Sequence, residues 1–280
     1  MESKKRIRFL CRYCKQSAHT KSMPQHWMKT EAEQEILRKG GKLLARIMDE
    51  LLEMAQVGVS TQAIGERAEA RILALGADPI FKGYGKAWGA PPFPAAICIS
   101  RNEEVVHGIP KKEVLLQPGD LLKIDIGMRY EGLVTDMART KGIGTITEEK
   151  KQLRAVVEQA LLAGISLLRP GVKMEAYAAA VEQVVKQAGF TCVRDLVGHG
   201  VGHELHEEPQ IANYTHSGLP NFSFEAGMVV ALEPMINAGS FQVELAPDAW
   251  TFVTKDGRPS AHWENTVLIT PHGFEVLTQV

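Results

Sequence analysis

The sequence predicts an α+β fold built from two related halves. Residues 58–76 and 171–189 are each typical of one helix, introduced by Gly-Val and closed by Gly. Residues 119–125 and 227–233 each contain a turn glycine, an apolar strand and a carboxylate six residues after the glycine. Because both similarities occur in the same order, we expect each half to contribute a strand-borne acid to a shared centre, where ligand sites commonly lie.

The composition of the chain favours an ordinary globular protein. It has 280 residues, of which 45% are apolar and 23% charged, and its net charge of −1 argues against whole-surface binding of nucleic acid. The start lacks the apolar segment of a secretion signal, and no apolar run is long enough to cross a bilayer. Four cysteines do not suggest a disulfide framework. We therefore expect a cytoplasmic protein without a membrane partner. A monomer is the expected oligomeric state, although none of these observations bears on it.

Residues 1–29 form a predicted basic extension, and residues 30–280 form the main domain. The extension holds Cys11 and Cys14, followed by His19 and His26. Paired thiolates and imidazoles can hold a structural Zn²⁺, while a short basic tail with two unused thiols is the other interpretation. The excess of lysine and arginine also suggests docking on ribosomal RNA, because basic side chains neutralise phosphates.

The helices of the main domain are predicted from capping and apolar spacing. Thr30 and Glu33 match a capping box, and apolar residues then recur at helical spacing to about residue 56. A second helix is predicted over residues 60–76, and two more over about 148–168 and 173–188.

Short apolar runs predict buried strands over residues 96–99 and 121–127. Residues 133–140 are the expected hairpin partner of the second strand. Residues 77–95 are turn-rich and aromatic, and residues 100–110 predict a polar loop that holds His107.

Four carboxylates stand in or beside these apolar strands: Asp125, Asp136, Glu233 and Glu264. A carboxylate in such a position is costly without a partner. Each alone could be satisfied by backbone N–H groups or by an arginine. Together with His199 they fit better as a cation cluster, since crowded carboxylates repel one another unless positive charge neutralises them.

His199 lies in a glycine-rich stretch, residues 198–209, that contains three histidines and three glutamates. A polar surface loop is the simpler interpretation of a lone histidine. Oxygen-rich ligands with one imidazole suit Mn²⁺, Fe²⁺, Co²⁺ or Zn²⁺. Two such ions can share a water, lower its pKa and polarise a carbonyl, so these residues predict a two-metal hydrolase.

At these motifs the chain resembles type I methionine aminopeptidases, which are pita-bread metallopeptidases. The likeness covers about residues 29–280 and implies a pita-bread fold, with two pseudo-symmetric halves and a curved antiparallel sheet covered by helices. The short interval between His199 and Glu233 favours type I, because type II carries a large insertion. The matching stretches are Ala96-Ile97-Cys98-Ile99-Ser100 through Val106-His107-Gly108-Ile109-Pro110, Lys123-Ile124-Asp125-Ile126-Gly127, Gly198-His199-Gly200-Val201-Gly202, His206-Glu207-Glu208-Pro209, Leu232-Glu233-Pro234-Met235, and Trp250 leading to Glu264.

By this resemblance, five residues would bind two divalent ions (Co, Mn, Fe or Zn). Asp125 would chelate one ion, and Asp136 and Glu264 would bridge both. His199 and Glu233 would complete the shell of the other.

The resemblance also implies the reaction. A water held between the metals would attack the carbonyl of an N-terminal methionine, with Glu233 as the proton shuttle. His206 would bond the carbonyl oxygen as negative charge builds on it, and His107 would contact the scissile amide. The implied activity removes the N-terminal methionine of nascent polypeptides when the second residue is small.

A methionine side chain needs an apolar, polarizable pocket. The positions that match the family's pocket are Tyr84, Phe93, Cys98, Leu205 and Trp250, and ordinary core is the alternative for each. The chain departs from the family pattern in a longer segment at residues 85–92, in Leu205 where an aromatic is common, and in Asn265 where a histidine often stands. These departures bear on specificity and not on the metal chemistry.

Two other classes of protein are possible. A pita-bread peptidase that cleaves next to proline would be expected to carry an extra N-terminal domain, which 29 residues cannot supply. A non-enzymatic binding protein on the same fold would typically lose metal ligands, whereas all five acceptable residues are present here.

Overall fold

The computed structural model describes residues 24–86, 91–219 and 222–280. The predicted zinc ligands Cys11 and Cys14, and with them most of the basic extension, lie outside these residues. The helices are η1 (Gln25–Trp27), α2 (Glu31–Met54), α3 (Thr61–Ala74), α4 (Glu148–Ile165) and α5 (Met174–Gln187). No helix within the described ranges combines the length and the apolar character that crossing a membrane requires.

The strands are short except for one long hairpin, formed by β3 and β4. They are β1 (Cys98–Arg101), β2 (Glu104–Val106), β3 (Leu121–Tyr130), β4 (Leu133–Gly142), β5 (Thr191–Cys192), β6 (Gly198–Gly200), β7 (Glu207–Ile211), β8 (Val229–Leu232), β9 (Met235–Asn237), β10 (Val243–Leu245), β11 (Phe252–Thr254), β12 (Ser260–His262), β13 (Glu264–Thr270) and β14 (Gly273–Val276).

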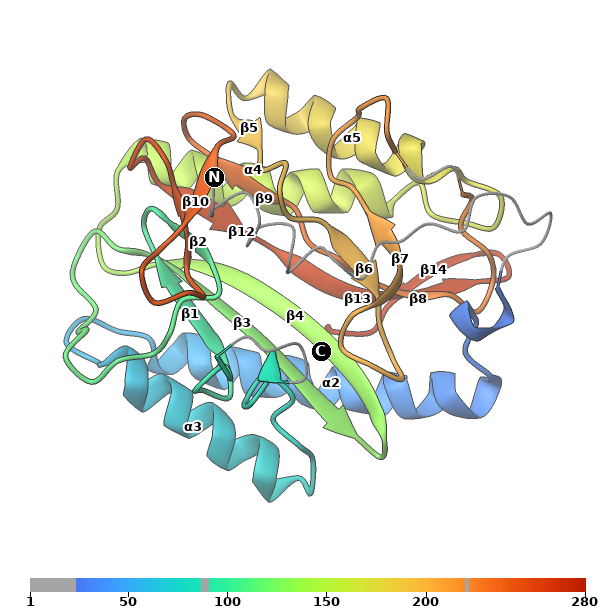
Figure 1. Cartoon of the computed structure of the whole chain (residues 1–280), viewed down its shortest axis with the longest axis horizontal. Coiled ribbons are helices and arrows are strands. Elements are labelled where there is room, and N and C mark those ends of the chain that lie inside the picture. The colour runs from blue at the N-terminus through green and yellow to red at the C-terminus, as the bar shows by residue number, and fades with distance from the viewer. Residues whose placement is uncertain (1–23, 87–90, 220–221) are drawn as a thin grey trace.

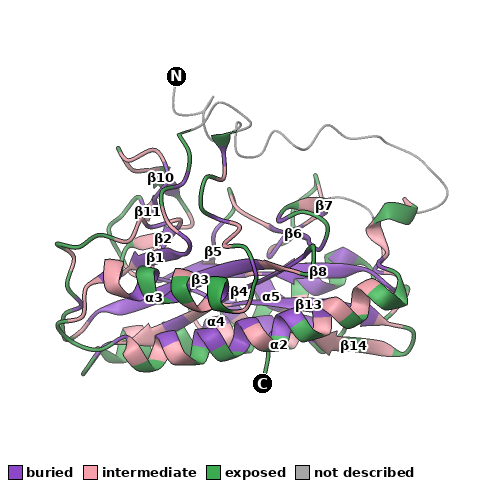
Figure 2. Cartoon of the chain, turned by 90° about the horizontal axis from the view of Figure 1, so that it is seen from below, coloured by how far each residue is buried: buried purple, intermediate pink, exposed green. Residues whose placement is uncertain are grey.

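The main sheet has the strand order β1-β3-β4-β13-β8-β6-β7, with β14 paired to β13, and its pairs are antiparallel. Figure 1 shows this sheet curving between α2 and α3 on one side of the view and α4 and α5 on the other. In the view of Figure 2 the four long helices lie on one side of the main sheet, and β10 and β11, which belong to a separate sheet, lie on the opposite side. The predicted curved sheet covered by helices is therefore confirmed.

Helix α2 begins where the capping pattern predicts. The Glu33 backbone N–H donates to Thr30 Oγ1 at 3.3 Å, and the Thr30 N–H donates to Glu33 Oε2 at 2.7 Å. This reciprocal pair satisfies two N–H groups at the start of the helix. Leu44, Met48 and Leu51 are buried and pack in the core between α2, α3 and the sheet.

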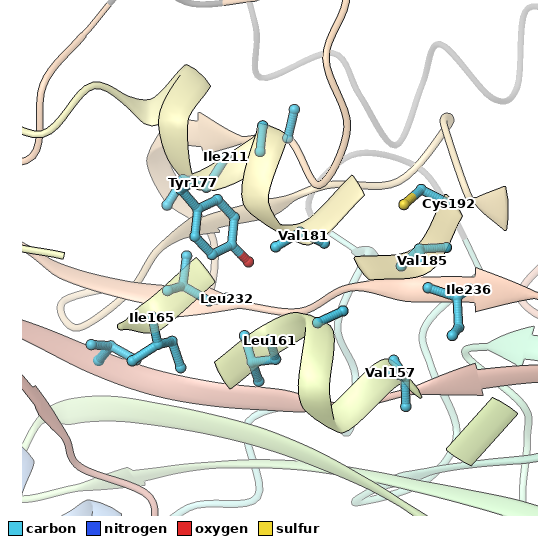
Figure 3. Packing of buried hydrophobic residues seen from close by; sticks show 14 of the residues in the cluster. Val157, Leu161, Ile165, Tyr177, Val181, Val185, Cys192, Ile211, Leu232 and Ile236 are labelled. Atoms are coloured by element: carbon cyan, nitrogen blue, oxygen red, sulfur yellow. The ribbon is translucent and has the colours of Figure 1, made fainter. Parts of the chain in front are cut away.

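The second pair of helices packs on the other half of the sheet. Figure 3 shows side chains of α4 and α5 converging on Leu232 and Ile236, with the Tyr177 ring between the two helices. Gly164 permits this close approach, because a Cβ atom there would lie 2.5 Å from the Tyr177 ring. The Tyr177 hydroxyl donates to Asn213 Oδ1 at 3.0 Å, so its one polar group is satisfied in the core.

The two halves repeat each other in backbone conformation. Gly58 and Gly171 have φ of 86° and 87°, and Gly119 and Gly227 have φ of 94° and 92°. Glycine adopts this left-handed region without the steric cost of a Cβ atom. The halves join where β4 pairs with β13, at the centre of the sheet. The prediction of two related α+β halves is thus confirmed.

Three elements differ from their predicted extent. Strand β3 continues past residue 127 to Tyr130, so the hairpin turn tightens to Glu131 and Gly132, both with positive φ. Strand β1 begins later than predicted, at Cys98. The predicted polar loop over residues 100–110 contains β2, which pairs with β11. That partner lies far along the chain, so local pattern does not reveal it.

Candidate metal centre

The register of three neighbouring strands places three acids on one face of the sheet. Asp125 in β3 lies opposite Ala138 in β4, and Ala138 lies opposite Glu264 in β13. Asp136 is two residues before Ala138 on β4, and side chains alternate along a strand. All three acids therefore point to the same face. Ile124, one residue from Asp125, points to the other face and packs in the core beneath α2 and α3.

The second half of the molecule brings His199 and Glu233 to the same face. His199 in β6 lies opposite Ala231 in β8, and Ala231 lies opposite Thr266 in β13. Thr266 is two residues after Glu264, so His199 shares the face of the acids. Glu233 is two residues after Ala231, directly beyond the end of β8.

Asp136, His199 and Glu264 each offer one ligand atom, and these atoms all lie within 4.8 Å of one another. Among the described residues, Asp125 Oδ1, Asp136 Oδ1 and Glu264 Oε1 are buried and have no hydrogen-bond partner. Bare carboxylate oxygens in a buried space are costly unless a cation compensates their charge. The residues present therefore fit a divalent metal site.

Burial and mutual repulsion keep protons on these acids when no cation is bound. Burial, followed by the charges of neighbouring acids, raises the pKa of Asp125 and Glu264 well above the ordinary range. Burial, opposed by His199 and assisted by Glu233, raises the pKa of Asp136 to about 7. A bound divalent cation would instead favour the ionised carboxylates, so binding and proton release are coupled.

The hydrogen bonds of His199 aim one ring nitrogen at the centre. Its Nδ1 lies 2.9 Å from the Gly200 carbonyl oxygen, which can only accept, so Nδ1 carries the proton. The Nε2 lone pair is then available as a ligand. Nε2 lies 3.3 Å from Glu233 Oε1. Burial would raise the pKa of Glu233, but close contact with the imidazoles of His199 and His262 lowers it to about 2, so Glu233 is ionised.

His107 and His206 line the same centre as neutral imidazoles. Burial lowers the pKa of His107 to about 4, and burial together with His199 lowers that of His206 well below its ordinary value. The His206 ring centroid lies 4.3 Å from that of His199. The Tyr84 hydroxyl contacts His206 Nδ1. If the phenol donates to Nδ1, the proton of His206 resides on Nε2, which makes that atom a hydrogen-bond donor.

The five residues predicted to line a pocket belong to one apolar cluster. Phe93, Cys98, Leu205 and Trp250 are buried members, and Tyr84 packs against them. The cluster borders the acids, because Cys98 lies opposite Asp125 in the register of β1 and β3. The end of the longer segment at residues 85–92 also reaches it, since the Trp250 indole N–H donates to the Pro91 carbonyl at 3.1 Å.

The sequence reasoning missed one residue of the centre, His262. Its side chain is 1% exposed, and its Nε2 lies 3.6 Å from Glu233 Oε2. Neither ring nitrogen has a hydrogen-bond partner among the described residues. The available signal was its position two residues before Glu264, on the same chain segment as a predicted ligand. The antiparallel pairing of His262 with Met235 brings it near Glu233, and that contact is tertiary.

We expect Ala138→Leu to abolish metal binding, because the added side chain would stand between Asp125 and Glu264 on the site's face of the sheet. Isothermal titration should show a loss of at least about a hundredfold in affinity. Met137→Leu, one residue earlier on the opposite face, is the matched control and should bind normally. Unchanged affinity in the Ala138 variant would contradict the placement of the ligands.

Buried carboxylates and one imidazole on a curved sheet define the class of metal-dependent hydrolases with a pita-bread fold. The profile of metallopeptidase family M24 matches residues 35–271, and the chain belongs to this family. Methionine aminopeptidase 1 of Bacillus subtilis is 42% identical over 254 residues, which cover 90% of this chain and 98% of that protein. The crystal structure of methionine aminopeptidase from Thermotoga maritima superposes with a TM-score of 0.85 at 38% identity, covering 90% of this chain and 99% of that one.

The similarity of the chain to a prolidase shows the fold alone. The prolidase of Pyrococcus furiosus superposes with a TM-score of 0.70 at 22% identity, and the match covers 65% of its chain. The present chain thus spans nearly the full length of the two methionine aminopeptidases but about two thirds of the prolidase.

Proposed function

We propose that this chain is a metal-dependent methionine aminopeptidase, which hydrolyses the peptide bond after an N-terminal methionine when the second residue is small. The observation that carries the proposal is the set of bare carboxylate oxygens of Asp125, Asp136 and Glu264 beside His199. The similarity of this chain to methionine aminopeptidases, over nearly the full length of those proteins, supports the substrate class.

Asp125, Asp136, His199, Glu233 and Glu264 would hold two divalent ions, with Mn²⁺, Fe²⁺, Co²⁺ and Zn²⁺ as the candidates. When bound, such a pair lowers the pKa of a water molecule and polarises a carbonyl group. The small side chains of Ala138 and Ala231 leave room on this face of the sheet between the ligating residues.

The remaining polar residues would position the substrate and move protons. Ionised Glu233 would accept a proton from the attacking water and pass it to the leaving nitrogen. His206, as an Nε2–H donor, would stabilise the negative charge that develops on the carbonyl oxygen. His107, neutral and held against the Trp250 and Phe252 rings, would contact the scissile amide.

The apolar cluster of Phe93, Cys98, Leu205 and Trp250, with Tyr84 against it, would receive the methionine side chain. An unbranched thioether side chain adapts to such a pocket and makes favourable contacts with aromatic rings. Because the cluster borders the acids, a side chain bound there would leave its own carbonyl group beside the metal centre.

The function is tested by hydrolysis of Met-Ala-Ser, Met-Lys-Ser and Ala-Pro peptides, each with Mn²⁺, Fe²⁺, Co²⁺ or Zn²⁺ and again with chelator. We expect methionine release from Met-Ala-Ser only, and its loss when the metal is removed. Cleavage of Ala-Pro in preference to Met-Ala-Ser would favour a proline-specific peptidase. Failure to release methionine with any of these metals would overturn the proposal.

Nascent polypeptides would be the natural substrates of such an enzyme. Four further proposals rest on the sequence alone. They are a cytoplasmic location, a monomeric state, association with ribosomes through the basic extension, and a zinc site at Cys11 and Cys14.

A further inference from the structure

A buried ion pair ties the base of the N-terminal extension to the loop that carries His206. Lys29 Nζ lies 2.7 Å from Glu207 Oε2, and the exposed fractions of the two side chains are 0% and 14%. Glu207 immediately follows His206 in the chain. A lysine is almost never fully buried unless it is paired, so this pair calls for an explanation beyond surface solubility.

The loop backbone is shaped to admit Lys29. Gly202 has φ of 142°, and a Cβ atom there would lie 2.3 Å from Lys29 Cε. The aliphatic part of the Lys29 side chain thus packs against the backbone of the loop at Gly202. Gly202 is the glycine between His199 and His206 that has a positive φ. The Lys29 backbone is fixed as well, because its N–H donates to the Gly227 carbonyl at 2.7 Å.

Glu207 connects the Lys29 side chain to the backbone of this loop. Its Oε1 accepts a hydrogen bond from the Glu204 backbone N–H at 2.8 Å, while its Oε2 holds Lys29. One carboxylate therefore bridges the lysine and the backbone of the loop that ends at His206. A second tie supports the same loop, since His203 Nε2 lies 2.7 Å from Glu33 Oε1 at the start of α2.

We propose that Lys29 is a positioning residue for catalysis, which acts through Glu207 to hold the His206 imidazole against the reacting carbonyl group. This inference rests on the proposed function. Residues 1–28 directly precede Lys29 in the chain. Misplacement of a catalytic group by about 1 Å can cost roughly a hundredfold in rate.

The test is Lys29→Met in the full-length, metal-loaded enzyme, with Met-Ala-Ser as the substrate. Methionine keeps the apolar stem and removes the ammonium. We expect kcat to fall at least about tenfold with KM nearly unchanged, which is the pattern of an interaction made in the transition state. The metal content should stay that of the wild type. Amide exchange at Glu204 should accelerate, because its acceptor Glu207 is no longer anchored.

A double-mutant cycle separates positioning from general stability. If Lys29 acts through His206, Lys29→Met should lower kcat in the wild-type background and have little effect in a His206→Ala background. Arg38→Met is the matched control, because Arg38 also projects from the N-terminal helix region and pairs with Glu275 at 2.9 Å. Its kcat should equal that of the wild type.

Should Lys29→Met fail to fold, Glu207→Gln provides the same test with an isosteric side chain, and it should lower kcat in the same manner. Equal kcat values for wild type and a folded Lys29 or Glu207 variant would overturn the inference, as would additive losses in the cycle. An inactive wild type with every metal would instead defeat the proposed function, so the two failures are distinguishable.

Discussion

Glu233→Gln is expected to lower kcat on Met-Ala-Ser by about a hundredfold to ten-thousandfold, the range typical of a lost proton-transfer group. Gln has the shape of Glu but cannot accept a proton from water near neutral pH. His199 and His262 lower the pKa of Glu233 to about 2 against the opposing effect of burial, so the wild-type side chain is ionised throughout the working range. Under the proposed ligand assignment, the variant would also lose one anionic metal ligand.

Initial rates at saturating metal measure the effect, and the circular dichroism spectrum and metal content show whether the fold and the site persist. Glu244→Gln, an exposed position on β10, is the control for charge removal and should retain full activity. A Glu233→Gln enzyme that turns over normally would remove Glu233 from the proton pathway.

Divalent metal is expected to stabilise the protein more at pH 8.5 than at pH 6.5. In the metal-free protein Asp125, Asp136 and Glu264 have raised pKa values, from burial and mutual repulsion. The folded chain therefore keeps protons that the unfolded chain has released, and this contribution to stability is lost as the pH rises through the folded-state pKa values. For Asp136 that window runs from the ordinary value of 3.8 up to about 7.

Metal binding removes these protons, so the stabilisation by metal grows with pH by about 1.4 kcal/mol per pH unit for each proton displaced. Lys123 has the opposite effect on how stability depends on pH. Because burial lowers its pKa to about 7, the folded chain releases a proton that the unfolded chain still holds, and this contribution to stability grows as the pH rises above 7. The quantity to compare is therefore the metal-induced increment and not the melting temperature itself.

The measurement is the melting temperature with and without Mn²⁺ at both pH values. The metal-induced increment should be larger at pH 8.5, and it should shrink at both pH values in an Asp125→Asn, Glu264→Gln variant. An increment that is independent of pH would show that the acids are already ionised in the metal-free protein.

The fold could be predicted far along the chain because its signals are local. Thr30 and Glu33 specify the start of α2 through bonds three residues apart. The alternation of Ile124, Asp125 and Ile126 already separates a core face from a site face. The glycines of the two halves mark turns with positive φ, a conformation that glycine adopts at low steric cost. The repeat can therefore be recognised in the sequence. The pairing of β2 with β11 could not be predicted from the sequence, because no local pattern specifies which distant strand pairs with a given strand.

The candidate site was predicted unevenly for the same reason. A carboxylate in an apolar strand is conspicuous by itself, which is why Asp125, Glu233 and Glu264 stood out. His262 gave no comparable signal, because its importance lies in a 3.6 Å approach to Glu233. Lys29 lay within the predicted basic extension, and the reason it is buried, the passage over Gly202 to Glu207, exists only in three dimensions.

The sequence by itself determined the two α+β halves, the strands that carry acids and the identity of the residues able to bind a cation. These follow from local propensity and from the cost of burying an unpaired charge. Only the tertiary structure decided that Ala138 and Ala231 leave the space, that ligand atoms of Asp136, His199 and Glu264 lie within 4.8 Å of one another, and that Lys29 pairs with Glu207 beside His206. The physical reason is that strand register and long-range packing, which no local pattern encodes, set the distances between side chains far apart in the chain.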